Sequence, residues 1–139
     1  MAPNADDVAS AYAGTARRTV TSGPMLLLAL YDRLTHDVEL AKRYLENSEY
    51  ERVDELLQHA QKIVIVLHAA LQPDGFRGGH ELRRLYSTVI DLLIKANLEK
   101  DAEKLAQCLK IIAPLHRAWS EAVAIELAKA ERGAPVGVA

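Results

Sequence analysis

Apolar residues recur along most of the chain at alternating spacings of three and four positions, the period of an amphipathic α-helix. The pattern divides into four segments of about 20 residues each, or ~30 Å in helical form. Each segment can place its apolar residues on one face. These positions are Leu27, Tyr31, Leu34, Val38, Ala41 and Leu45; Val53, Leu57, Ala60, Val64, Leu67 and Leu71; Leu82, Leu85, Tyr86, Val89, Leu93 and Ala96; and Leu105, Cys108, Leu109, Ile112, Leu115, Trp119, Ala122 and Ile125. The pattern predicts an all-α protein.

Residues with known end preferences mark where these helices begin. Pro24 suits the first position of the first helix, where its missing N–H costs nothing. Ser48, with Glu51 three positions later, is a capping-box pattern that would open the second helix. Asp101 is a good cap for the fourth helix. Pro114 lies inside that helix and predicts a bend, because it removes one backbone hydrogen bond.

The connections between the four segments are short, so consecutive helices should be antiparallel neighbours. The predicted architecture is an antiparallel up-down-up-down four-helix bundle that occupies residues 21–131. Residues 1–20 and 132–139 carry no core pattern, so we predict a flexible N-terminal arm and a mobile C-terminal tail.

The chain carries more apolar residues than four singly buried faces require. The start of the first helix is apolar on nearly every side, from Met25 to Tyr31. A helix that is apolar all round is buried on more than one side, which indicates a protein partner in addition to the core. Further residues widen the apolar stripes: Leu26, Leu28, Leu56, Ile63, Val66 and Ile90. For Tyr31, Tyr86 and Trp119 two interpretations stay open, simple packing or the lining of a partner groove.

Composition and motifs narrow the possible functions. The net charge of −2 argues against nucleic-acid binding, which needs a concentrated basic face. The single cysteine, Cys108, suits a reducing compartment, and residues 1–10 do not read as a secretory signal. No apolar run reaches the roughly 18 residues of a membrane span. His80 and Glu81 begin like a zinc-protease motif, but Arg84 stands where the second histidine belongs. We therefore expect no catalytic residue, no metal site and no cofactor.

A series of residues in a specific order and spacing resembles the FliS family of flagellin export chaperones. The series comprises Tyr12, residues 19–22, Pro24, residues 26–28, residues 30–32, residues 60–63, Leu67, Leu71, residues 78–79, Leu85, Tyr86, Leu93, Ala96, Asn97, Asp101, Ala118 and Trp119. The resemblance covers most of the chain.

This resemblance implies a cytoplasmic helical bundle that binds the disordered C-terminal segment of flagellin in hydrophobic grooves between helices. Such a chaperone stops flagellin from polymerising early and delivers it to the flagellar type III export apparatus. We expect a monomer or weak homodimer, with no nucleic acid bound and no insertion into a membrane. The candidate client-binding residues are Tyr12, Leu26, Leu30, Tyr31, Leu56, Ile63, Val66, Leu67, Leu85, Tyr86, Ile90 and Asn97. Leu34, Leu93 and Trp119 are assigned to the structural core.

Two other interpretations remain. One is a helical-bundle enzyme, which the absence of ligand and catalytic patterns disfavours. The other is a non-enzymatic helical adaptor or dimerisation module that binds a different amphipathic helix.

Overall fold

The computed structural model describes residues 23–74 and 77–133, and helices are the only regular secondary structure within them. The fold class predicted from the sequence, an all-α bundle, is confirmed. The four helices are α3 (Gly23–Glu46), α4 (Tyr50–Ala70), α5 (Gly79–Glu99) and α6 (Ala102–Gly133). Tyr12 and the predicted arm lie outside the described residues, as does the chain after Gly133.

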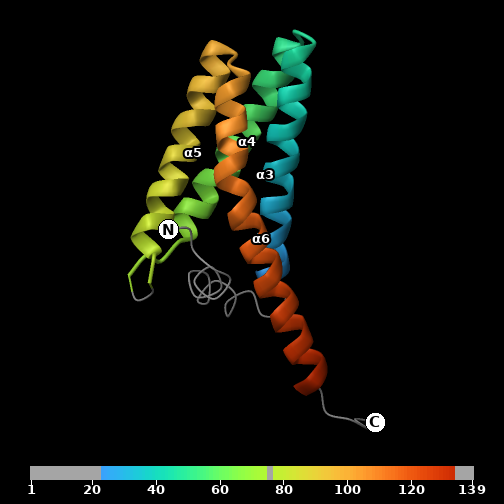
Figure 1. Cartoon of the computed structure of the whole chain (residues 1–139), viewed down its shortest axis with the longest axis vertical. Coiled ribbons are helices and arrows are strands. Elements are labelled where there is room, and N and C mark those ends of the chain that lie inside the picture. The colour runs from blue at the N-terminus through green and yellow to red at the C-terminus, as the bar shows by residue number, and fades with distance from the viewer. Residues whose placement is uncertain (1–22, 75–76, 134–139) are drawn as a thin grey trace.

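Successive helices run in opposite directions, so the described chain makes four passes along the bundle, alternately up and down (Figure 1). Helix α3 packs against α4 and α6, and α5 packs against the same two helices. The helices α3 and α5 therefore face each other diagonally, as do α4 and α6. Each helix therefore presents one flank to each of its two neighbours.

The apolar stripes of all four helices meet in a continuous core. Leu34, Leu93 and Trp119, which the sequence assigned to the core, are buried there. Tyr31 and Tyr86 are also buried, and their hydroxyl groups are hydrogen-bonded to each other across the diagonal from α3 to α5. Because a buried hydroxyl needs a partner, this pair lets two tyrosines lie in an otherwise apolar interior.

The connection between α3 and α4 corrects the capping prediction. Ser48 has a positive φ of 58°, and its N–H donates to the carbonyl oxygen of Leu45 at 3.1 Å. The next N–H, that of Glu49, donates to the carbonyl oxygen of Tyr44 at 3.0 Å. These two bonds form a Schellman motif, so Ser48 ends α3, and no side chain caps α4. The prediction that Ser48 opens the second helix is wrong.

The start of α6 follows the prediction. A carboxylate oxygen of Asp101 accepts a hydrogen bond from the N–H of Glu103 at 2.9 Å, the geometry of a helix cap. Pro114 lies inside α6, and the helix changes direction along its length (Figure 1). The last turns of α6 extend beyond the start of α3, away from the body of the bundle.

Candidate functional site

The outer surface between α4 and α5 forms a groove with a volume of about 450 Å³. The side chains that line it come from one stripe on each helix, because positions four and three apart share a helix face. They are Asp54, Gln58, Gln61, Lys62 and Ile65 of α4, and Ile94, Asn97 and Leu98 of α5. The groove is thus built by segments that lie far apart in the sequence.

Three apolar residues of this groove are exposed to solvent. Their exposed fractions are 52% for Ile65, 41% for Ile94 and 80% for Leu98. A single exposed leucine is ordinary on a protein surface, whereas several apolar side chains gathered in one hollow indicate a binding site. The sequence analysis did not single out these three residues. Ile94 and Leu98 are spaced by four, which could have identified them as a second, outward stripe on α5.

Asn97 holds a polar network together at one end of the groove. Its side-chain Nδ2 donates to Oδ1 of Asp54 at 2.7 Å, and its Oδ1 accepts from Nζ of Lys100 at 2.6 Å. The second carboxylate oxygen of Asp54 accepts from Nε2 of Gln58 at 2.7 Å. The hydrogen bond from Asn97, followed by that from Gln58, lowers the pKa of Asp54 below its ordinary value. The carboxylate is thus held in its charged form, and α4 is tied to α5.

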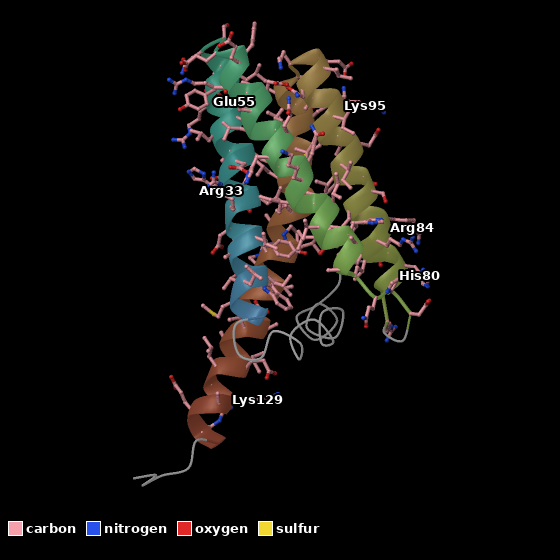
Figure 2. The ribbon with its side chains drawn as sticks, turned by 180° about the vertical axis from the view of Figure 1, so that it is seen from behind. Arg33, Glu55, His80, Arg84, Lys95 and Lys129 are labelled. Atoms are coloured by element: carbon pink, nitrogen blue, oxygen red, sulfur yellow. The ribbon has the colours of Figure 1, made fainter. Side chains whose placement is uncertain are left out.

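A second groove of about 450 Å³ lies between α3 and α4. Three charged side chains line it, and one of them, Arg52, donates to the hydroxyl of Tyr44 at 3.0 Å and lies over the ring of that tyrosine. Its lining residues are Leu40, Tyr44, Glu51, Arg52, Glu55 and Leu56. Figure 2 shows Glu55 on this side of the molecule.

Along the same α3–α4 boundary lies a carboxylate that is entirely buried, that of Asp37. Nε of Arg33 donates to one of its oxygens at 3.0 Å, and Nδ1 of His59 on α4 contacts the other. A buried carboxylate persists only with such partners, because removing a charge from water is costly. Asp37 therefore links α3 to α4 at a buried position.

Helix α3 is joined to its other neighbour by a similar pair. Nε2 of His116 on α6 lies 2.5 Å from a carboxylate oxygen of Asp32, and Nδ1 of the same ring lies 3.4 Å from the hydroxyl of Thr35. The ring also stacks on Tyr31, with centroids 6.3 Å apart. Imidazole–carboxylate contacts therefore hold α3 on both of its flanks.

The residues predicted to contact a client fall into three environments. Leu26 and Val66 are exposed. Leu30, Leu56, Leu85, Ile90 and Asn97 are partly buried. Tyr31, Ile63, Leu67 and Tyr86 are buried in the core. Contact of a client with this last group would require the bundle to open, and the assignment of the whole set to client binding stays a prediction.

The structure places most of these residues along two boundaries. Leu26 and Leu30 continue the spacing of Asp37 and Tyr44 on α3, so they lie on the flank that faces α4. Leu56 and Ile63 share the corresponding stripe of α4 with His59. Ile90 continues the stripe of Ile94 and Asn97 toward the other end of the α4–α5 groove. Leu85 belongs to neither boundary.

Within the described residues, no group of three or more His, Cys, Asp or Glu side chains could hold a metal ion. Burial raises the pKa of the Cys108 thiol to about 12, which keeps it protonated and unreactive. No helix in the described part of the chain is long and apolar enough to cross a membrane.

The fold and its grooves define a class of protein: a small antiparallel helical bundle with amphipathic outer grooves suited to a helical or extended protein partner. The family model described as "Flagellar protein FliS" matches residues 6–126. This chain belongs to the FliS family. It is also similar to the flagellar secretion chaperone FliS of Bacillus subtilis (strain 168), with 27% identity over 117 residues, which cover 84% of this chain and 86% of that protein.

Proposed function

We propose that this protein is a flagellar export chaperone that binds the C-terminal segment of flagellin in the groove between α4 and α5. Membership of the FliS family supports the class. The observation that carries the site is the gathering of Ile65, Ile94 and Leu98 in one groove while most other large apolar side chains are in the core. By covering the part of flagellin that assembles, the chaperone prevents polymerisation in the cytoplasm and delivers its client to the type III export apparatus.

The dimensions of the groove fit a short amphipathic helix. From Asp54 to Ile65 the groove follows α4 for about 17 Å, at 1.5 Å per residue. A client helix of about three turns would cover this length and place an apolar side chain against each of the exposed apolar positions. The α3–α4 boundary, with Leu26, Leu30 and Leu56, offers a second surface for a longer client that continues around the bundle.

Isothermal titration calorimetry with the flagellin C-terminal segment from the same cell tests this proposal. We expect one-to-one binding at micromolar concentration or tighter, with a negative heat-capacity change from apolar burial. Leu98→Asp should weaken binding tenfold or more, since burial of one leucine contributes about 1.5–3 kcal/mol. Circular dichroism should show an unchanged fold, because Leu98 is exposed.

Ile125→Asp provides the matched control. Ile125 is 44% exposed, close to the value for Ile94, but it lies on α6 and lines neither groove. This variant should bind as the unaltered protein does. If the unaltered protein binds no flagellin segment, the chaperone proposal is overturned. Equal weakening by Leu98→Asp and Ile125→Asp would overturn the choice of groove.

A further inference from the structure

Asn97 is held by two partners of opposite chemistry, which fixes the orientation of its amide. A carboxylate can only accept hydrogen bonds and an ammonium group can only donate them. The contacts with Asp54 at 2.7 Å and Lys100 at 2.6 Å are therefore satisfied only with Nδ2 toward Asp54 and Oδ1 toward Lys100. In the opposite orientation, the Asn97 oxygen would face the Asp54 carboxylate and the Asn97 nitrogen would face the Lys100 ammonium group, and neither pair can form a hydrogen bond.

An amide side chain has two N–H groups and two acceptor lone pairs. The contact with Asp54 uses one N–H group, and the contact with Lys100 uses one lone pair. One N–H and one lone pair of Asn97 are left, in a groove that also holds the exposed apolar side chains of Ile65, Ile94 and Leu98. A free donor and a free acceptor on one rigid group are suited to unpaired backbone groups of another chain.

Asn97 lies where the end of a client helix could meet it. Asn97 lies in the last turn of α5, and Asp54 lies near the start of α4, so the polar network closes one end of the groove. A client helix that ended beside this network would leave backbone N–H or C=O groups there without intrahelical partners. Burial of these groups requires hydrogen bonds from the chaperone.

We propose that Asp54 is a positioning residue for client recognition: it orients the Asn97 amide toward unpaired backbone groups at the end of the client helix. This inference rests on the proposed function and adds to it a residue that fixes where the client helix stops. Asp54 acts through Asn97: one of its carboxylate oxygens accepts from Asn97 and the other from Gln58, so the carboxylate is itself fixed in place.

Calorimetric titration of the flagellin segment into single and double variants tests the proposal. Asn97→Ala and Asp54→Ala should each weaken binding about tenfold. The double variant should bind no more weakly than Asn97→Ala alone, because the two residues act as one unit. Asp54→Asn should restore part of the affinity, since its carbonyl oxygen can still accept from the Asn97 amide. Glu121→Ala is the control, because it removes the same charge from an exposed position of α6 that lines neither groove.

Thermal unfolding of each variant separates recognition from a merely structural contact between α4 and α5. A structural contact would lower the unfolding temperature and leave the affinity of the folded protein unchanged. Binding by Asp54→Ala within twofold of the unaltered protein, or additive losses in the double variant, would overturn the inference. Both results differ from failure of the chaperone proposal, in which the unaltered protein itself does not bind.

Discussion

The buried carboxylate of Asp37 gives the sharpest prediction about stability. Asp37 is fully buried, whereas the side chains of its partners Arg33 and His59 are 59% and 47% exposed. Figure 2 shows Arg33 on the outer surface of α3. Removal of one partner leaves one charge-assisted hydrogen bond to Asp37, at a cost of about 1.5–3 kcal/mol. Removal of both leaves a buried unpaired charge, which costs about 3–5 kcal/mol.

The effect of Asp37→Ala on the free energy of unfolding should therefore depend on whether Arg33 and His59 are present. In the unaltered protein, Asp37→Ala should lower the free energy of unfolding, because two charge-assisted bonds and some packing are lost. In the Arg33→Ala/His59→Ala background, Asp37→Ala should raise the free energy of unfolding by about 2 kcal/mol, because the substitution then removes an unpaired buried charge. These values are large relative to the 5–15 kcal/mol total of a typical domain.

Urea unfolding followed by circular dichroism measures these differences, with the slope of the transition checked for constancy. Glu39→Ala is a suitable control, because Glu39 is an exposed carboxylate on the same helix and should change the free energy of unfolding by less than about 0.5 kcal/mol. If Asp37→Ala lowers stability by the same amount in both backgrounds, the argument from an uncompensated charge is refuted.

Three further predictions concern single side chains. Trp119→Ala should cost about 3–5 kcal/mol in urea unfolding, because the ring is buried; a near-neutral result would contradict its place in the core. Asp101→Ala should lower the unfolding temperature through loss of the α6 cap. Hydrogen bonds from Lys104 and Glu103 lower the pKa of Asp101, so its contribution to stability is present above the ordinary pKa and is lost as the pH falls through the folded value. An unchanged dependence of the unfolding temperature on acidic pH in the variant would contradict this. Cys108 should resist alkylation in the folded protein, and rapid labelling at pH 8 would contradict its burial. Because burial raises the pKa of its thiol to about 12, Cys108 stabilises the fold fully below its ordinary pKa and progressively less at higher pH.

Local pattern in the sequence was sufficient to locate the helices. The three-and-four spacing of apolar residues is a property of one helix alone, so it predicted four helices and the buried faces of Leu34, Leu93 and Trp119. The cap at Asp101 is equally local, because a carboxylate reaches the N–H two residues later without help from the rest of the fold. Short connections then favour an antiparallel bundle.

Ser48 shows where local pattern becomes ambiguous. A serine three positions before a glutamate suits the start of a helix, but the connection between α3 and α4 spans only residues 47–49. In so short a connection the chain must both end one helix and begin the next. The Schellman bonds that end α3 place Ser48 in the left-handed region, and its side chain then does not cap α4.

The grooves were decided by tertiary structure. Helical spacing predicts the direction in which a side chain points from the axis of its helix. It does not predict which neighbouring helix packs there, or which residue of that helix lies opposite. Asn97 meets Asp54 across 43 positions of sequence, and His59 meets Asp37 across 22. These meetings depend on the register between two helices, which the whole core sets. The sequence by itself therefore determined the helices and the class of fold, whereas packing decided that Ile63 is buried while Ile65, Ile94 and Leu98 remain exposed along a groove.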